Sequence, residues 1–345
     1  MDLALLVATP VMGKPAWMWL FFLGIVLTIL VLDLGVLHRK QREIGVRESM
    51  LLSTGYMALA GLFGLYVLWQ MGGNAAAEFY TGYLVEWSLS LDNVFVISLI
   101  FTYFHIPRIY QHRVLFWGII GVIVMRGTMI FLGAALVREF DWVMYLFGAF
   151  LLFTGVKLLV SVDSEPDIAS NPVLKITRRL FRVTDQLDGN HFFTKAAHPR
   201  TGRLVSYATP LFMALVMIEF VDLVFAVDSV PAIFAITDDP FIIYTSNIFA
   251  VLGLRSLYFA LAAMIHRFHY LKYALALVLI FIGSKIFYTQ IWGKLPPAIS
   301  LSVTFGILAA GVVYSLYRTS REPAVVQPTV QDDAPDTLPA SGRTY

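Results

Sequence analysis

Long apolar runs separated by short polar segments dominate the pattern of this chain. Nine runs are long enough to cross a bilayer, since about 20 apolar residues span a hydrocarbon core of roughly 30 Å. We expect spans at residues 17–37, 51–71, 80–103, 113–137, 142–160, 207–230, 241–265, 272–291 and 297–317. The sequence therefore predicts an all-α, polytopic membrane protein of about nine transmembrane helices.

Composition agrees with this pattern. Of the 345 residues, 58% are hydrophobic and only 14% are charged, and the mean hydropathy is +0.74. Soluble domains carry about a quarter charged residues, so a soluble class is disfavoured. The absence of cysteine removes disulfides, thiolate metal sites and thiol redox relays. Residues 1–16 lack a basic start followed by an apolar stretch, so no cleavable signal peptide is expected there.

The positive charges of the loops predict how the chain is oriented. Lys and Arg on one side of the predicted spans number 18, against three on the other side, which are Lys14, Arg138 and Lys294. Cytoplasmic loops carry the excess of Lys and Arg in membrane proteins. We therefore expect the amino terminus outside the cell and the carboxyl terminus in the cytoplasm.

Two groups of three spans resemble each other. The matched segments, in order, are residues 90–97 with 220–227, the surroundings of Arg126 with those of Arg255, and 152–157 with 280–285. The offsets are 130, 129 and 128 residues, and the first match pairs Asp92 with Asp222. Because three spans are an odd number, the second copy must enter the membrane from the opposite side. The sequence thus predicts an inverted repeat of two three-helix units, as in many secondary transporters; duplication preserved only for packing is the alternative.

This organisation divides the chain into six parts. They are an amino-terminal extracytoplasmic segment with two peripheral spans (1–71), the first repeat (72–160), a cytoplasmic loop (161–206), the second repeat (207–291), the ninth span (292–318) and a disordered cytoplasmic tail (319–345). Within the loop, residues 171–183 predict a short basic amphipathic helix on the inner leaflet. Residues 191–194 and 203–208 predict a hairpin. A connecting role for the loop is favoured over a regulatory one.

Ten of the 48 charged side chains fall inside predicted spans, where each costs about 2.5–3.5 kcal/mol at the centre of a helix. They are Asp33, Glu86, Asp92, Glu219, Asp222, Asp228, Arg126, Lys157, Arg255 and Lys285. Six acids against four bases leave two negative charges, which one divalent cation or two protons would neutralise. A structural ion-pair network is the alternative, and it is favoured for the four bases. For Asp33, a helix-end role and a transport role are equally supported.

Helical spacing groups the acids. Glu86, Ser90 and Asn93 lie at i, i+4 and i+7 on one face, and Glu219 and Asp222 lie at i and i+3. Pro231 predicts a broken or kinked helix near 227–231, which would turn Asp228 inward. The predicted metal site is Glu86, Asp92, Asn93, Glu219, Asp222 and Asp228.

These oxygen ligands suit Mn²⁺, Mg²⁺ or Ca²⁺. All seven histidines fall in loops or at span ends, so zinc and copper are disfavoured. Arg126 and Arg255 are expected to pair with acids, and Lys157 and Lys285 to hold the third helix of each repeat in place.

Several long motifs resemble the TerC family of integral membrane proteins, in particular its bacterial Alx type. They are residues 32–38, 86–95, 111–118, 147–157 and 219–236, and the resemblance extends over about 17–317. It implies a nine-span protein of the bacterial inner membrane that exports manganese, with Glu86, Asp92, Glu219, Asp222 and Asp228 as its acidic motif residues. Trp87 departs from the family pattern, because many relatives have Lys after the first motif Glu.

The leading hypothesis is therefore a secondary exporter of Mn²⁺, which is the transported ion rather than a permanent cofactor. A carboxylate site that loses its metal in a low-dielectric cavity favours proton uptake, so proton antiport is a weaker second hypothesis. The rivals are a Ca²⁺ transporter and a non-transporting scaffold that assists assembly of other proteins. No hydrolase motif occurs, so an intramembrane enzyme is disfavoured; no ATP-binding loop occurs, so ATP-driven pumping by this chain alone is disfavoured as well. Nothing in the chain points to a nucleic-acid partner.

Overall fold

The computed structural model describes residues 9–33, 45–140, 142–160, 171–197, 202–262, 271–293 and 295–321; the side chains of Asp92 and Asp228, among a few others, lie outside this description. Its helices are Ala16–Leu32 (α2), Val46–Met71 (α3), Gly73–Tyr103 (α4), Arg108–Glu139 (α5), Trp142–Val160 (α6), Pro172–Leu180 (α7), Pro210–Phe234 (α8), Pro240–Ala262 (α9), Leu271–Trp292 (α10) and Pro297–Arg321 (α11). Two antiparallel hairpins pair Pro10–Val11 (β1) with Lys14–Pro15 (β2) and Phe193–Ala197 (β3) with Leu204–Ala208 (β4).

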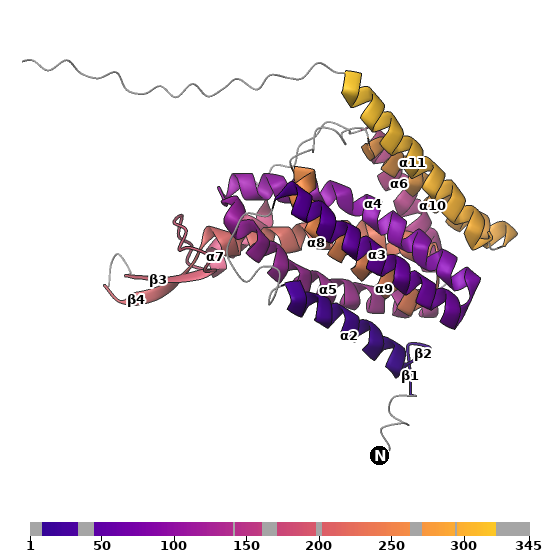
Figure 1. The fold of residues 1–345 in the computed structure, drawn as a ribbon, viewed down its shortest axis with the longest axis horizontal. Coiled ribbons are helices and arrows are strands. Elements are labelled where there is room, and N and C mark those ends of the chain that lie inside the picture. The colour runs from indigo at the N-terminus through magenta and orange to yellow at the C-terminus, as the bar shows by residue number, and fades with distance from the viewer. Residues whose placement is uncertain are drawn as a thin grey trace, which may run out of the picture.

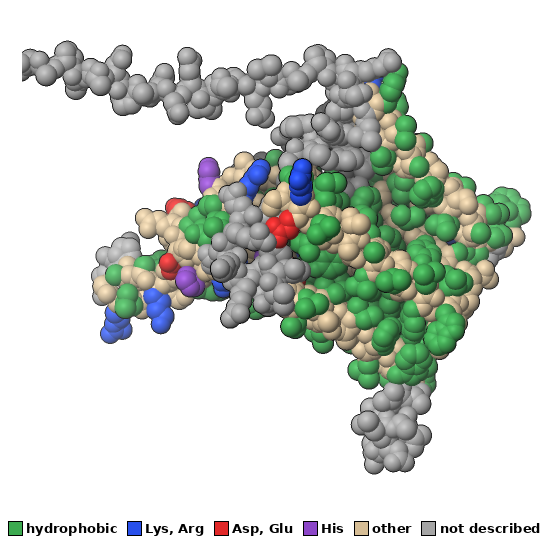
Figure 2. Space-filling view, in the orientation of Figure 1, with side chains coloured by type: hydrophobic (Ala, Val, Ile, Leu, Met, Phe, Trp, Pro, Cys, Tyr) green, Lys and Arg blue, Asp and Glu red, His purple; other side chains and the backbone are tan. Residues whose placement is uncertain are grey.

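The predicted all-α membrane class is confirmed. Eight helices of the described ranges are long and apolar enough to cross a membrane, and α2 adds a shorter apolar helix of 17 residues. That length is at the lower limit for a span. Large apolar side chains cover the outer faces of the bundle, Leu51 and Trp69 among the most exposed at 75% and 80%. Figure 2 shows this apolar belt, with charged side chains gathered at one end of the molecule.

The helices α4 and α9 form the centre of the bundle. In these two, 69% and 83% of the most apolar 18-residue stretch is buried, against 17% in α11. In Figure 1, α2 lies along one side of the bundle and α11 along the opposite side. Because α4 and α9 are enclosed by other helices, their polar side chains face protein and not lipid.

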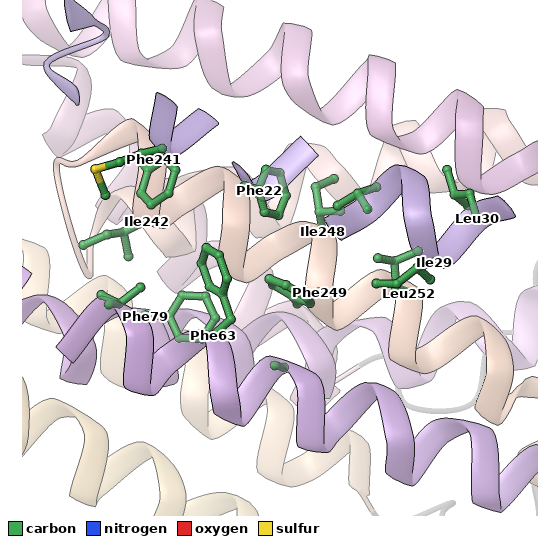
Figure 3. Packing of buried hydrophobic residues seen from close by; sticks show 14 of the residues in the cluster. Phe22, Ile29, Leu30, Phe63, Phe79, Phe241, Ile242, Ile248, Phe249 and Leu252 are labelled. Atoms are coloured by element: carbon green, nitrogen blue, oxygen red, sulfur yellow. The ribbon is translucent and has the colours of Figure 1, made fainter. Parts of the chain in front are cut away.

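Aromatic rings of α2 and α3 pack against each other and against α9. Phe22 of α2 and Phe63 of α3 pack with ring centroids 5.8 Å apart, and Phe249 of α9 lies 4.9 Å from Phe63 (Figure 3). Met18, Phe22 and Val26 recur every fourth residue, so α2 buries a narrow stripe and leaves its other faces outside. Such offset and edge-to-face pairs add about 0.5–1.5 kcal/mol each beyond the buried area.

Two glycines bring α6 and α10 into close contact. A methyl group on Gly155 would lie 3.0 Å from the carbonyl oxygen of Ala276 and 2.8 Å from the side chain of Ile280. A methyl group on Gly283 would lie 3.0 Å from the carbonyl oxygen of Gly148 and 3.0 Å from the side chain of Leu152. At the offset of 128 residues, Gly155 corresponds to Gly283, Gly148 to Ala276 and Leu152 to Ile280. Each contact made by one glycine therefore has a counterpart in the contacts of the other. The α6–α10 interface is therefore reciprocal, residue by residue.

The segment between α6 and α8 contains a short helix and a hairpin where it is described. The helix α7 begins with Pro172, and Asn171 Oδ1 accepts a hydrogen bond from the Val173 amide at 2.9 Å, which caps it. Leu174 of α7 is buried in a cluster with Leu211 of α8, so this helix docks on the protein. The strands β3 and β4 form the expected hairpin, which extends with α7 from one end of the bundle (Figure 1).

Two sequence predictions are corrected here. Of the break or kink expected near 227–231, the break is absent, because α8 runs as one helix to Phe234 with Pro231 inside it. Pro231 lacks only the hydrogen bond that its own nitrogen would donate to the carbonyl of Val227, and the helix continues for one further turn. The tail that was expected to be disordered from residue 319 is helical as far as Arg321, where α11 ends; no proline occurs between Pro297 and Pro323. Residues 322–345 lie outside the described residues, and so do residues 34–44, which include the end of the first predicted span.

Candidate functional site

Four charged side chains lie buried between the central helices. Glu86 of α4 is fully buried, and Arg126 of α5, Asp222 of α8 and Arg255 of α9 are only 2%, 7% and 6% exposed. In a bilayer, such side chains must face partners, water or an ion. They form two neighbouring groups, each built around one arginine.

The first group, here called the Glu86 cluster, consists of Glu86, Ser90, Arg126, Ser229 and Asn247. Glu86 forms an ion pair with Arg126 through Oε1, and the same oxygen accepts a hydrogen bond from Ser90 Oγ at 3.0 Å. Its other oxygen accepts from Asn247 Nδ2 at 3.2 Å. Arg126 donates to Asn247 Oδ1 and to Ser229 Oγ, the latter at 3.4 Å. Side chains from α4, α5, α8 and α9 thus share one network.

A cavity of about 80 Å³ adjoins this cluster. Its polar wall is Glu86, Ser90, Asn93, Arg126, Thr154 and Ser229; its apolar wall is Leu89, Leu158, Phe225, Leu275 and Leu279. A single water needs about 10–15 Å³ of such space, so the cavity has room for a hydrated ion or a few waters. It lies between α4, α5, α6, α8 and α10, which all belong to the two predicted repeats.

The second group, here called the Asp222 cluster, consists of Asn93, Asp222 and Arg255. Asp222 Oδ2 accepts from Arg255 Nη2 at 2.8 Å, and Asp222 Oδ1 accepts from Asn93 Nδ2 at 3.3 Å. Arg255 also donates to the carbonyl oxygen of Leu115. Asn93 lines the cavity and its Oδ1 is buried without a partner among the described residues, so it links the two clusters and leaves one acceptor free.

Glu219 is the one described acid of the predicted site that has no arginine partner. Both of its carboxyl oxygens are buried, and neither has a hydrogen-bond partner within the described ranges. The carboxyl group lies against the backbone of α5 at Gly118 and Gly121. Although Glu219 and Asp222 share a helix face as expected, Glu219 does not line the cavity beside Glu86.

The predicted six-residue metal site is only partly described. The structure brings Glu86, Asn93 and Asp222 to one polar centre, with Glu219 on its edge, whereas the side chains of Asp92 and Asp228 lie outside the description. Among the described residues, no three His, Asp or Glu side chains are grouped closely enough to hold a metal ion. The convergence of all the acids on one ion stays a prediction.

The supporting bases differ from one another. Arg126 and Arg255 each pair with an acid on the first helix of their own repeat. Lys285 of α10 is buried, and its Nζ donates to Ser300 Oγ of α11 at 3.3 Å, which ties α10 to α11. Lys157 is exposed in the last turn of α6.

Asp33, at the end of α2, lies beside a second and smaller cavity. Asp33 Oδ2 is 3.5 Å from Nε2 of His112, and both side chains line this cavity of about 30 Å³ together with Arg255.

Sequence reasoning missed Asn247 and Ser229. Asn247 bonds both Glu86 and Arg126, and the run Thr245-Ser246-Asn247 is fully buried in α9. Three consecutive polar residues inside an apolar span were the available signal. The two glycines beneath Glu219 gave no comparable signal, since glycine is common in membrane helices.

Known proteins resemble this chain over most of its length. A sequence model of the integral membrane protein TerC family matches residues 71–323, which include the whole of the polar centre. An uncharacterized membrane protein of Rickettsia bellii (strain RML369-C) is 48% identical over 300 residues, 87% of this chain and 97% of the relative. An uncharacterized membrane protein of Myxococcus xanthus is 45% identical over 326 residues, 94% and 98% of the two chains.

A third relative, of Escherichia coli (strain K12), is 44% identical over 305 residues, 86% of this chain and 92% of its own. Its name, Alx, comes with the description of a candidate membrane-bound redox modulator. No solved structure matches the chain.

Proposed function

Because the chain belongs to the integral membrane protein TerC family, we propose that it is a secondary transporter that exports a divalent metal ion, with Mn²⁺ as the candidate ion. The observation that carries the proposal is the cavity of about 80 Å³ at the meeting point of α4, α5 and α8, lined by Glu86, Ser90 and Asn93. A cavity lined by carboxylate and amide groups among apolar spans is costly to a bundle whose helices only pack together. Such pockets mark ion pathways in membrane proteins.

The arginines supply the positive charge that the carboxylates require when the cavity holds no cation. Arg126 neutralises Glu86, and Arg255 neutralises Asp222. A divalent ion that enters the cavity would compete with Arg126 for Glu86, and the guanidinium would turn toward Asn247 or Ser229, to which it is already bonded. Arg126 keeps its charge in this exchange, so the two charges of the ion must be balanced by acids other than Glu86 and Asp222, and the sequence offers Asp92, Glu219 and Asp228 for this.

Oxygen ligands favour a hard divalent cation. Glu86 and Asp222 offer carboxylates, and Asn93 Oδ1 offers an unpartnered amide oxygen at the cavity. Asp92 and Asp228 follow on the same two helices and would complete the set. Mn²⁺ accepts such ligands, as Mg²⁺ and Ca²⁺ do, and the choice of manganese rests on the family resemblance.

The transport mechanism we propose is alternating access between inverted repeats. The reciprocal contacts of Gly155 and Gly283 across α6 and α10 support a two-fold relation between the repeats. Ions bind between such repeats near the membrane centre, and rocking of one repeat against the other opens the site to either side. Proton entry would accompany metal exit if the released carboxylates take up protons, with Glu219 as the unpaired acid nearest to the site.

The setting we propose is the bacterial inner membrane, with the amino terminus outside, the carboxyl terminus in the cytoplasm and lipid as the surrounding partner. The bacterial relatives and the 18-to-3 distribution of Lys and Arg support it. Transport needs no covalent step, so no enzymatic activity is proposed. Thiol exchange is not part of the proposal either, because the chain has no cysteine.

Metal flux into liposomes tests the proposal. The purified protein is reconstituted in vesicles that contain a dye quenched by Mn²⁺, and the initial rate is measured for the wild type and for Glu219→Gln and Asp222→Asn. We expect about a 10- to 100-fold lower rate for both, the range seen when supporting groups of a metal site are removed. The exposed Glu139→Gln is the matched control and should transport normally.

Two further outcomes separate the alternatives. Wild-type vesicles that take up no Mn²⁺, Mg²⁺ or Ca²⁺ would favour the scaffold function, in which acid-to-amide changes are mild. A flux that neither responds to an imposed pH gradient nor moves protons would remove antiport alone and leave metal transport in place.

A further inference from the structure

Two glycines of α5 form a notch under the carboxyl group of Glu219. Gly118 and Gly121 lie one turn apart on the face of α5 that meets α8. A methyl group on Gly121 would overlap the carboxyl group of Glu219, with Oε1 only 2.7 Å away. A methyl group on Gly118 would lie 3.0 Å from the same oxygen and would overlap Nη1 of Arg255. An added methyl group at either position would therefore force this carboxyl group or its neighbour Arg255 to move.

The same helix pair provides an apolar counterpart. Gly133, farther along α5, receives the ring of Phe234 of α8, whose Cε2 would lie 2.8 Å from an added methyl group. Glycine inside a helix costs about 1 kcal/mol relative to alanine, so close approach is the gain that offsets this cost. Small residues allow membrane helices to approach in this way. At Gly133 the approach accommodates an aromatic ring, whereas at Gly121 it accommodates a carboxyl group.

The notch offers Glu219 space without hydrogen bonds. The backbone amides of α5 are already used within the helix, and both Glu219 oxygens lack a partner among the described residues. The carboxyl group lies near Arg255 but is not paired with it. Arg255 is bonded instead to Asp222 and to the carbonyl oxygen of Leu115. A side chain at Gly121 would expel the carboxyl group from the notch toward these neighbours, where it would compete with Asp222 for Arg255.

We propose that Gly118 and Gly121 are positioning residues that keep the Glu219 carboxylate unpaired and free to receive the transported cation or its counter-proton. This inference rests on the proposed transport function. The position of the Glu219 carboxyl group is thus set by two glycines, which have no side chain of their own. The notch also explains why Glu219 is the one acid of the three described that forms no ion pair with an arginine.

Gly121→Ala tests the inference, with Gly133→Ala as a matched control that adds the same methyl group to the same helix pair. In the liposome assay we expect the Mn²⁺ concentration for half-maximal flux to rise about 10- to 100-fold in Gly121→Ala, the range for misplaced supporting groups of a metal site. The maximal flux should change little. Gly133→Ala should lose thermal stability and keep its half-saturating concentration.

The double variant Gly121→Ala/Glu219→Asp makes the result specific. The shorter acid leaves room for the methyl group, so the half-saturating concentration should fall back toward that of Glu219→Asp alone. If Gly121→Ala does not fold, the double variant should fold, since the clash is with Glu219. The inference is overturned if Gly121→Ala behaves like Gly133→Ala, or if shortening Glu219 restores neither flux nor folding.

The outcomes also distinguish this inference from the proposed function. A wild type that transports no divalent cation refutes transport, while thermal unfolding of the four variants still reports whether Glu219 occupies the notch. A wild type that transports Mn²⁺ together with an unaffected Gly121→Ala refutes only the positioning role.

Discussion

The two repeats place an arginine at equivalent positions, yet Arg126 and Arg255 end in different surroundings. Arg126 belongs to a network in which Glu86 is fully buried and every bond of the arginine is made to a side chain. Arg255 divides its bonds between Asp222, whose side chain is 9% exposed, and a backbone carbonyl of α5. A cavity adjoins the first cluster, whereas the second has an unpaired acid, Glu219, beside it.

Under the proposed transport function, this difference would give the two predicted repeats separate tasks. The repeat preserves the arginine and the small residues that pack α6 on α10, and these determine how the halves fit together. The acid partner is not preserved, since Glu86 precedes the position that corresponds to Asp222 by six residues. In the described residues, a cavity therefore lies beside the first cluster, and a carboxylate without a hydrogen-bond partner lies beside the second.

The largest effect is expected when either arginine is removed. Arg126→Met leaves Glu86 buried without a compensating charge, which should cost about 3–5 kcal/mol of stability. Arg255→Met should cost less, because Asp222 is slightly exposed and keeps its bond from Asn93. Thermal unfolding in detergent measures both, with Lys157→Met at an exposed position as the control. Equal losses would remove the difference between the clusters.

A second substitution shows whether the ion pair is the cause. Glu86→Gln added to Arg126→Met removes the uncompensated charge, so stability should return in large part. A double variant as unstable as Arg126→Met alone would indicate that the bulk of Arg126, and not its charge, supports the bundle.

The two asparagines should separate stability from ion affinity. Asn247 bonds Glu86 and Arg126, and hydrogen bonds to charged groups contribute about 1.5–3 kcal/mol, so Asn247→Ala should destabilise the protein by that amount. Asn93 makes one long bond of 3.3 Å to Asp222 and lines the cavity. Asn93→Ala should therefore unfold close to the wild type and raise the half-saturating Mn²⁺ concentration. The opposite order of effects would place the ion outside the cavity.

Local spacing allowed part of this site to be predicted. Glu86 and Ser90 lie four residues apart on one helix, and the structure joins them at 3.0 Å as the pattern requires. Asn247 lies 161 residues from Glu86, and nothing local to either residue specifies that pairing. The packing of α4 on α9 decides it, and packing follows from many apolar contacts at once.

The same reasoning explains where the predictions were incomplete or wrong. Glu219 and Asp222 share a helix face, but Glu219 lies against two glycines of α5, whereas Asp222 is paired with the long side chain of Arg255 from α9. For Pro231, the residue type was interpreted without its distance from the helix end, and α8 continues through it. The length of the apolar runs, by contrast, was sufficient to predict a membrane-spanning helical protein, because the number of apolar residues that cross a bilayer is a property of each segment alone.

The smallest effects are expected at the interface that the repeats share. Gly155→Ala and Gly283→Ala each add one methyl group against a backbone carbonyl of the facing helix, and overpacking of this kind costs about 1–3 kcal/mol. Because Gly155 and Gly283 make equivalent contacts, the losses of stability in the two variants should agree within experimental error. Gly306→Ala on α11, where an added methyl group meets nothing within 4 Å, should leave thermal unfolding unchanged or slightly stabilised. Clearly unequal losses at Gly155 and Gly283 would show that the repeats have diverged at the interface as well as at the acids, and the two-fold relation on which alternating access depends would lose its support.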